Sequence, residues 1–429
     1  KVRGPLGVNG LDDRIYIEGG RKLRGNVVIQ GSKNAALPMM AASLLHRGTS
    51  VLRGCPKIAD VFCMEKILKS LGAVTWWEKQ DLYMDCTKAD KTEIPVAYTS
   101  RMRSSVILLG ALLGRSQKGC LGYPGGCVIG KRPVDLHVFV LRGLGARIQE
   151  TDGIIRAACE RLKGTKILFP KRSVGATEQG ILGAVLAKGE TVLENCACEP
   201  EIVWLCRYLC SMGAKIKGQG TDEIIIQGVK KLEAGEMQVP PDRIVAGTYI
   251  CAASATRSQI TLENVPENEL SSFLEVYRKI GGQYEGNSGK LIVNGKNVCK
   301  PVKLLETGVY PGFPTDLQSQ MMAVLATIPG ESCIVEQIFE DRYKVANELM
   351  RMGADITVNG RTARIQGKKR LSGHPVEAME LRGGAALILA ALAAEGTTVL
   401  QGYSYVQRGY EHICQDLNQL GASVKRIQE

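Results

Sequence analysis

The sequence predicts an α/β (α+β) protein of two similar lobes, each built from three βαβαββ units packed around buried helices. The first observation behind this prediction is a short phrase that returns six times, about 70 residues apart. Its copies are "LKSLGAVTW", "LRGLGARIQ", "LCSMGAKIK", "YRKIGGQYE", "LMRMGADIT" and "LNQLGASVK", and together these units account for almost the whole chain.

The second observation is the order of elements within each unit. A Gly or Ser precedes a short apolar strand, as in "GTSVLRG" and "GETVLEN". A helical pattern follows, for example Met64, Ile67, Leu68 and Leu71 at i, i+3, i+4 and i+7. The glycine of the repeated phrase then ends that helix, because a positive φ is favourable for glycine. An alternating strand such as "KIKGQG" follows, and then a turn and another strand. A second, Ala-rich helix such as "KNAALPMMAASLL" completes the unit.

The third observation is the length of the unit. Periods of 20 to 50 residues are typical of solenoids, and this period is longer. One unit cannot bury its apolar face alone, whereas three can pack their helices inward, so six units predict two lobes. We place the boundaries at 1–32 plus 241–429 for the C-terminal lobe and at 33–240 for the lobe that carries the Cys127 loop. We treat residues 1–13 as a tag or extension.

Composition fits a soluble globular protein of about two domains, with reduced thiols in the cytoplasm. The chain has 429 residues, 45% hydrophobic and 23% charged, which is longer than one core usually supports. Its longest apolar run, about Ala385 to Ala394, is too short to cross a bilayer. The N-terminal stretch lacks the apolar region of a secretory signal, so the 14 cysteines are expected to be reduced thiols.

The charge of +12 raises the question of nucleic acid. Aromatic residues are only 5%, and no basic run exceeds "GKKR" at Gly367 to Arg370, so neither a stacking platform nor a phosphate-tracking stripe is visible. Cations gathered around a small anionic substrate fit better, although for most single Lys and Arg residues a solvated surface is the simpler interpretation. We therefore expect no nucleic-acid partner and no membrane partner.

The candidates for a zinc site in the sequence are Cys196, Cys198, Cys206 and Cys210. The second pair lies one turn apart in the apolar helical pattern "IVWLCRYLC", which favours packing in the core. The sequence therefore predicts no metal.

The loop "QGSKNAALP", Gln30 to Pro38, opens an Ala-rich helix. Amide groups at a helix start together with Lys33 can bind an anion. An ordinary Ser or Asn cap with Lys33 in water explains the same letters, and this loop alone does not decide between the two.

The loop "YPGGCVIGKRPVDLH" places Cys127 among glycines and cations. Gly125, Gly130 and Lys131 give G-x4-G-K, but Arg132 follows where a P-loop needs Ser or Thr, so an NTPase is disfavoured. A mobile lid is the better interpretation. The neighbouring cations favour the thiolate of Cys127, which could serve as proton donor or nucleophile, while a packing cysteine remains the alternative.

The stretch "YPGFPTDLQSQ" puts Asp316 at a helix start, as a capping carboxylate or as a general base. Arginines suited to bidentate binding of carboxylate or phosphate occur beside small residues in other repeats. They are Arg103, Arg342, Arg382 and Arg408. Each could be a surface ion pair, but together they indicate one cluster.

Several motifs stand in a family-specific order: "GSKNAALP", "PGGCVIGKRPVDLH", "SVGATE", "FPTDLQ", "EDR" and "RGYE". On these motifs the sequence, from about Ile15 onward, resembles the bacterial UDP-N-acetylglucosamine enolpyruvyl transferases (1-carboxyvinyltransferases). The resemblance implies an inside-out α/β barrel with the active site in the inter-lobe cleft. It also implies transfer of enolpyruvyl from phosphoenolpyruvate to the sugar nucleotide, the first committed step of peptidoglycan synthesis, without cofactor.

The resemblance also implies roles for individual residues. Cys127 would protonate or bind phosphoenolpyruvate and would be the target of fosfomycin, and Asp316 would take the proton of the sugar hydroxyl. Phosphate would be held by Lys33, Arg132 and Arg408, and the carboxylate by Arg342 and Arg382. The residues left to hold the sugar nucleotide are Asn34, Arg103, Arg132, Pro133, Val134, Asp135, Leu136, Lys171, Ser173, Val174, Gly175 and Ile338.

Two rival functions stay open at this point. One is enolpyruvyl transfer to shikimate 3-phosphate on the same fold, and the other is a catalytically silent protein that binds sugar nucleotides. We expect a cytoplasmic monomer whose partners are two small molecules, phosphoenolpyruvate and UDP-N-acetylglucosamine.

Overall fold

The fold comes from a computed structural model that describes residues 13–125, 129–130 and 133–427. Cys127, Lys131 and Arg132 lie outside the described residues. The described chain forms two compact units. Unit 1 runs to Gln30 and resumes at Pro241, with the short segment 129–130 added, and unit 2 holds the residues between Gly31 and Pro240 apart from that segment.

Unit 2 has three inner and three outer helices besides two short ones. The inner helices are α1 (Lys33–Ser43), α4 (Leu108–Ser116) and α6 (Val174–Ala184). The others are α2 (Ala59–Ser70), α3 (Val96–Thr99), η1 (Arg103–Ile107), α5 (Asp135–Gly143) and α7 (Pro200–Ser211). Its strands are β3 (Thr49–Arg53), β4 (Val74–Glu78), β5 (Asp81–Asp85), β6 (Glu93–Ile94), β7 (Lys118–Gly122), β8 (Arg147–Thr151), β9 (Ile154–Ala158), β10 (Lys166–Leu168), β11 (Glu190–Glu194), β12 (Lys215–Lys217), β13 (Glu223–Gln227) and β14 (Glu236–Gln238).

Unit 1 repeats this plan. Its inner helices are α8 (Arg243–Ala255), α10 (Gln318–Leu325) and α12 (Leu381–Ala393). The others are η2 (Glu267–Leu270), α9 (Ser271–Lys279), η3 (Thr315–Leu317), α11 (Val345–Arg351), α13 (Tyr403–Val406) and α14 (Ile413–Gln419). Its strands are β1 (Arg14–Glu18), β2 (Asn26–Val28), β15 (Gln259–Glu263), β16 (Gln283–Asn287), β17 (Lys290–Asn294), β18 (Leu305–Glu306), β19 (Gly330–Val335), β20 (Asp355–Asn359), β21 (Thr362–Gly367), β22 (Pro375–Glu377), β23 (Thr397–Gln401) and β24 (Ser423–Ile427).

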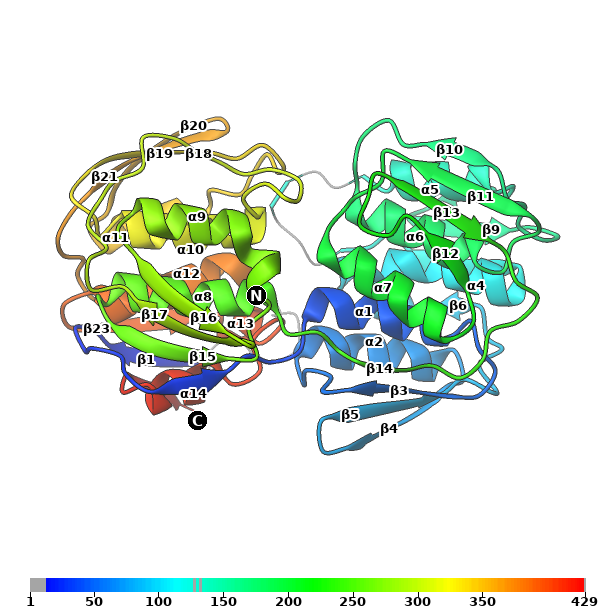
Figure 1. Cartoon of the computed structure of the whole chain (residues 1–429), viewed down its shortest axis with the longest axis horizontal. Coiled ribbons are helices and arrows are strands. Elements are labelled where there is room, and N and C mark those ends of the chain that lie inside the picture. The colour runs from blue at the N-terminus through cyan, green and yellow to red at the C-terminus, as the bar shows by residue number, and fades with distance from the viewer. Residues whose placement is uncertain (1–12, 126–128, 131–132, 428–429) are drawn as a thin grey trace. The chain divides into compact units, whose positions relative to one another are not determined.

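The described strands form six four-stranded sheets of one common pattern, three in each unit. In every sheet an edge strand pairs in parallel with its neighbour, and the remaining pairs are antiparallel, as in the order β10-β11-β13-β12. Figure 1 shows α8, α10 and α12 within unit 1, with strands such as β17 and β21 outside them. The predicted α/β class with three βαβαββ units per lobe is confirmed.

The inner helices are buried on every side because their sequences are almost free of charge after the first turn. Residues 35–43 of α1 and 381–392 of α12 are all buried. Inner helices also approach closely: a Cβ on Gly110 of α4 would lie 2.7 Å from the Gln179 carbonyl oxygen of α6, so only glycine fits there. Outer helices are amphipathic, as in α9, which buries Phe273 and Tyr277.

The six glycines of the repeated phrase end the six outer helices, as predicted. Each follows the C-terminal cap residue in the left-handed region, with φ between +91° and +104°. They are Gly72, Gly145, Gly213, Gly281, Gly353 and Gly421. A side chain at this φ would be strained, which explains why glycine marks every unit.

Two strands are exchanged between units of the repeat. β2 precedes α1 in the chain but pairs in parallel with β15 of unit 1, and β14 precedes α8 but pairs in parallel with β3 of unit 2. The chain therefore crosses between the compact units just after β2 and again just after β14. The N-terminal strand β1 lies between β23 and β24 and completes the last sheet.

Candidate functional site

Several of the residues singled out from the sequence lie at the starts of the inner helices. In unit 2, Lys33 is the first residue of α1, Arg103 is the first residue of the η1 turn before α4, and Ser173 caps α6. In unit 1, Asp316 lies in the η3 turn before α10, and Arg382 is the second residue of α12. A helix start presents unpaired amide groups and the positive end of the helix dipole, which suits anionic ligands.

Asp316 lies between two arginines in unit 1. Its Oδ1 accepts a hydrogen bond from Arg342 Nη2 at 2.8 Å, and its Oδ2 accepts one from Arg382 Nη2 at 2.9 Å. The arginine side chains are 2% and 4% exposed, whereas that of Asp316 is 29% exposed. The capping alternative is wrong, because the N-cap of η3 is Pro314 and no side chain caps that turn. The carboxylate is the accessible member of a buried ionic cluster.

The two arginines retain hydrogen-bonding capacity. Among the described residues, neither Arg342 Nε nor Arg382 Nη1 has a hydrogen-bond partner, and both atoms are buried. Burial opposes the charge on Arg382, but the nearby Asp316 carboxylate raises the pKa of this guanidinium above its usual value. A buried, permanently charged donor without a partner is suited to bind a second anion, such as the carboxylate or phosphate of a substrate.

Aromatic rings cover both guanidinium groups. The Arg342 guanidinium carbon lies 5.4 Å from the centre of the Phe339 ring, and that of Arg382 lies 5.9 Å from the Tyr410 ring. The Tyr410 hydroxyl in turn lies 2.8 Å from the Thr248 hydroxyl. Burial raises the pKa of Tyr410, so this ring is an uncharged wall. Arg408 lies two residues before Tyr410, is half-buried, and follows α13.

Lys33 does not extend into water. Its Nζ lies 3.1 Å from Asp60 Oδ2, with the two side chains 13% and 6% exposed. Ser32 caps α1 by accepting from the Ala35 amide at 3.3 Å. The Ser cap predicted as the ordinary alternative is thus present, but its companion, a solvated Lys33, is wrong. Asp60 in the first turn of α2 was missed, and nothing but its acidic first-turn position marked it in the sequence.

The two segments expected to hold a nucleotide meet in unit 2. A Cβ on Gly175, at the start of α6, would lie 2.8 Å from Cε1 of His137, at the start of α5. The residues just before each helix are therefore close together. Arg103 Nη2 donates to the Pro133 carbonyl at 2.9 Å and links η1 to the same segment. Among the residues expected to hold the nucleotide, Val134 and Leu136 are buried, while Pro133, Asp135 and Lys171 are exposed.

Within the cysteine loop, the structure describes residues 123–125, 129–130 and 133–137. The Ile129 carbonyl accepts from the Asp341 amide at 3.1 Å, and a Cβ on Gly130 would lie 2.6 Å from Glu340 Oε2. This part of the loop thus contacts the "EDR" segment that carries Arg342, within unit 1. The positions of Asn34 and Ile338 are half-buried, at the second residue of α1 and in the loop after β19.

Arg243, a charged residue at the position equivalent to that of Lys33, was not singled out from the sequence. Arg243 is the first residue of α8, as Lys33 is of α1, and is buried with its guanidinium 5.8 Å from the Tyr310 ring. Its place in the repeat, after a Pro-Pro-Asp step that matches the Gly-Ser before Lys33, could have revealed it.

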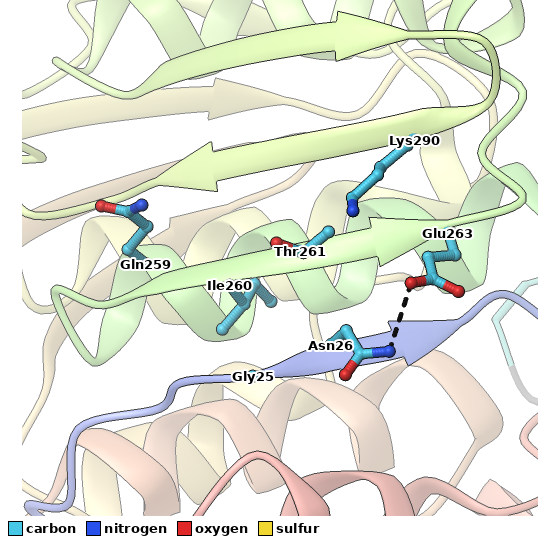
Figure 2. A pocket seen from close by; sticks show the side chains of 7 residues that line it. All are labelled: Gly25, Asn26, Gln259, Ile260, Thr261, Glu263 and Lys290. Carbon is cyan, nitrogen blue, oxygen red and sulfur yellow. Dashed lines mark hydrogen bonds between the residues drawn. The ribbon is translucent and has the colours of Figure 1, made fainter.

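A pocket in unit 1 is lined by none of the candidate site residues described above. It has a volume of about 490 Å³ on the β2–β15–β17 sheet and is lined by Gly25, Asn26, Gln259, Ile260, Thr261, Glu263 and Lys290. Figure 2 shows Asn26 hydrogen-bonded to Glu263 across adjacent strands, at 3.2 Å. Its polar groups do not converge on one point, so it supports no catalytic interpretation.

Within the described ranges, no group of three or more His, Cys, Asp and Glu side chains could hold a metal ion. In the same ranges, no helix combines the length and apolar character needed to span a bilayer.

Comparisons with known proteins agree on one family. The model of the EPSP synthase (3-phosphoshikimate 1-carboxyvinyltransferase) family matches residues 17–417. A protein of Caldanaerobacter subterraneus named UDP-N-acetylglucosamine 1-carboxyvinyltransferase 2 is 44% identical over 414 residues, which is 96% of this chain and 99% of that protein. A protein of the same name from Carboxydothermus hydrogenoformans is 42% identical over 419 residues, covering 97% and 100%. The crystal structure of the enolpyruvyl transferase NikO from Streptomyces tendae is similar in fold, with a TM-score of 0.86, 23% identity and coverage of 96% and 99%.

Proposed function

The chain belongs to the EPSP synthase (3-phosphoshikimate 1-carboxyvinyltransferase) family, and we propose that it transfers enolpyruvyl from phosphoenolpyruvate to the 3′-hydroxyl of UDP-N-acetylglucosamine. It is an enzyme of the carboxyvinyltransferase type. The choice of acceptor is supported by the relatives that are 42% and 44% identical over nearly their whole length and carry this name.

The observation that carries the proposal is the position of Asp316. Its carboxylate is partly exposed and is held at 2.8 and 2.9 Å by Arg342 and Arg382. A carboxylate fixed in this way is suited to take the proton of an attacking hydroxyl, and the remaining guanidinium N–H groups are suited to bind the carboxylate of phosphoenolpyruvate.

The proposed reaction proceeds by addition and elimination. The sugar 3′-oxygen attacks C2 of phosphoenolpyruvate while Asp316 takes its proton, and C3 receives a proton from Cys127. The resulting tetrahedral adduct loses a proton from C3 and releases phosphate from C2, which restores the double bond. Lys33, Arg132 and Arg408 stabilise the phosphate as charge accumulates on it.

The uridine diphosphate of the sugar nucleotide is proposed to bind unit 2. The segment 132–136, together with Lys171, Ser173, Val174 and Gly175, would hold the uridine diphosphate, and the contact of Gly175 with His137 supports a shared site. Asn34, Arg103 and Ile338 would contact the sugar. An acid, a base and fixed cations suffice for this chemistry, so the proposal includes no cofactor.

The test is phosphate release by purified protein from phosphoenolpyruvate with each acceptor in turn. We expect release with UDP-N-acetylglucosamine and none with shikimate 3-phosphate. The reverse result would assign the rival transfer reaction. Binding of the sugar nucleotide without any phosphate release would identify a catalytically silent protein.

Further properties belong to the same proposal. The protein would act in the cytoplasm as a monomer in the first committed step of peptidoglycan synthesis, and hence in cell shape and division. Fosfomycin would add one covalent adduct at Cys127, which intact mass spectrometry detects and which the Cys127→Ser variant should lack.

A further inference from the structure

Glu336 is a fully buried acid directly after strand β19, with 0% exposure. Its backbone is fixed at both ends. Its amide donates to the Arg361 carbonyl at 2.8 Å, and its own carbonyl accepts from Arg361 Nη1 at 3.0 Å. The side chain therefore leaves the end of the sheet from a rigid position.

The Glu336 carboxylate joins two separate segments. Its Oε1 accepts from the amides of Ile338 at 2.9 Å and Phe339 at 3.1 Å. Its Oε2 accepts from the Thr315 hydroxyl at 2.9 Å. One side chain thus fixes both the loop after β19 and the η3 turn before α10.

Both segments carry residues of the candidate site. Thr315 immediately precedes Asp316, and the loop leads through Phe339, whose ring lies 5.4 Å from the guanidinium carbon of Arg342. Arg342 returns to Asp316 with a hydrogen bond of 2.8 Å. The contacts form a closed ring in which Glu336 is opposite the Asp316–Arg342 pair.

We propose that Glu336 is a positioning residue. It fixes the position of the proposed base Asp316 relative to the loop that carries Ile338 and Arg342. This inference rests on the proposed function. Glu336 has no surface on which a substrate could bind, so it acts through Thr315 and the two loop amides. Displacement of a reacting group by about 1 Å can lower a rate by about 100-fold, so such a link affects turnover strongly.

The hydrogen bonds of Glu336 to the two segments can be removed separately by substitution. Thr315→Val removes only the hydrogen bond to the turn that carries Asp316, so we expect a kcat lowered about 10-fold with both KM values unchanged. Glu336→Ala removes the hydrogen bonds to both segments, so we expect a kcat lowered about 100-fold. The KM for UDP-N-acetylglucosamine should also rise, because Ile338 moves. Glu336→Gln keeps an acceptor for the amides and a polar group for Thr315, and should restore kcat to within about threefold of wild type.

Thr307→Val is the matched control. The buried Thr307 hydroxyl accepts from the Gln337 amide at 2.9 Å in the same loop, but this contact does not involve the Asp316 turn. Thermal unfolding of all variants is measured to verify that each is folded at the assay temperature. The Thr307→Val variant should lose stability without the loss of kcat seen in Thr315→Val.

The outcomes separate this inference from the proposed function. Wild-type protein that releases no phosphate overturns both. If wild type is active but Thr315→Val and Glu336→Ala turn over like Thr307→Val, or if Glu336→Gln is as slow as Glu336→Ala, only the positioning role is overturned. A kcat loss in Thr315→Val without a change in KM, together with the Gln rescue, supports it.

Discussion

The two units share one scaffold but carry different chemistry at the starts of their inner helices. In unit 2 the inner helices begin with Lys33, paired to the buried Asp60, with the Arg103 turn, and with the Ser173 cap. In unit 1, Asp316 in the turn before α10 lies between Arg382 of α12 and Arg342 of the loop before α11. Unit 2 thus presents cations and small polar caps, whereas unit 1 presents an accessible acid inside a cationic cluster.

This difference is possible because the scaffold depends on other residues. Both units have the same sheets and apolar inner helices, and in each unit three glycines end the outer helices. The residues at or just before the start of an inner helix contribute little to that packing, so they can differ between helices, as Lys33 of α1 and Asp316 of the η3 turn do. The comparison places the proposed base Asp316 in unit 1, and it places side chains suited to anion binding in both units.

The largest effect that we expect is on catalysis in unit 1. Asp316→Asn keeps an acceptor oxygen for one of the two arginines but cannot take a proton, so kcat should fall about 1,000-fold with a smaller change in the affinity for phosphoenolpyruvate. Steady-state phosphate release and substrate titration measure the two quantities. A kcat within about tenfold of wild type would remove the assignment of the base to unit 1.

The next effect concerns stability at the other end of the inner helices of unit 2. The buried Arg115 donates to the carbonyls of Leu44 at 2.7 Å, Cys86 at 2.6 Å and Ala89 at 2.8 Å. Arg115→Met leaves these carbonyls without a donor, so the free energy of unfolding should fall by roughly 3 kcal/mol. Denaturant unfolding is the measurement.

Arg257→Met is the corresponding variant in unit 1, where Arg257 Nη2 donates to the Thr327 carbonyl at 2.8 Å. If both variants lower the same unfolding transition equally, the two units do not unfold separately. If each variant lowers a different unfolding transition, the two units unfold separately and their stabilities can be compared.

A smaller effect is expected for the cation of unit 2. Lys33→Met removes the charge proposed to bind phosphate, so the KM for phosphoenolpyruvate should rise about 30-fold, near 2 kcal/mol, with a smaller change in kcat. Lys66→Met, an exposed lysine of α2, is the control. A loss in kcat as large as that of Asp316→Asn would contradict the division of roles between the units.

The smallest effect is a dependence of stability on pH. Burial, together with Glu201 and Glu199, raises the pKa of Glu178 in α6 well above its usual value. The folded protein therefore keeps a proton that the unfolded chain releases, so this group lowers stability as pH rises from the unfolded pKa towards the folded one.

Glu178→Gln imitates the protonated form and removes that loss. The variant should match wild type near pH 4 and exceed its stability by about 1 kcal/mol at pH 5.5, with a growing difference above. Glu190→Gln, at an exposed position of β11, is the control. Equal stabilities of the Glu178 variant and wild type at all pH values would show that this carboxyl is ionised in the folded state.

Much of the fold could be predicted because its signals are local. The glycine of each repeated phrase is required by the left-handed φ after an outer helix, and Met64, Ile67, Leu68 and Leu71 form a fully buried face at helical spacing. These constraints act within a few residues of the chain, so a single sequence displays them.

The contacts of the candidate site were less predictable. The sequence indicated Lys33, Asp316, Arg342 and Arg382 as chemical groups, but not that Asp60 pairs with Lys33 or that both arginines bind one carboxylate. Asp316 and Arg382 are 66 residues apart in the chain. Their meeting depends on the packing of α10 against α12, to which local patterns contribute nothing specific.

By itself, the sequence determined six repeats, their helical and strand periods, and the residue types available for anion binding and proton transfer, because each is encoded over a short span. Only the tertiary structure decided that β2 and β14 are exchanged between sheets and that Glu336 joins the Thr315 turn to the Ile338 loop. Strand exchange uses backbone hydrogen bonds that any sequence can make, and a buried carboxylate finds its donors only when distant segments are packed together.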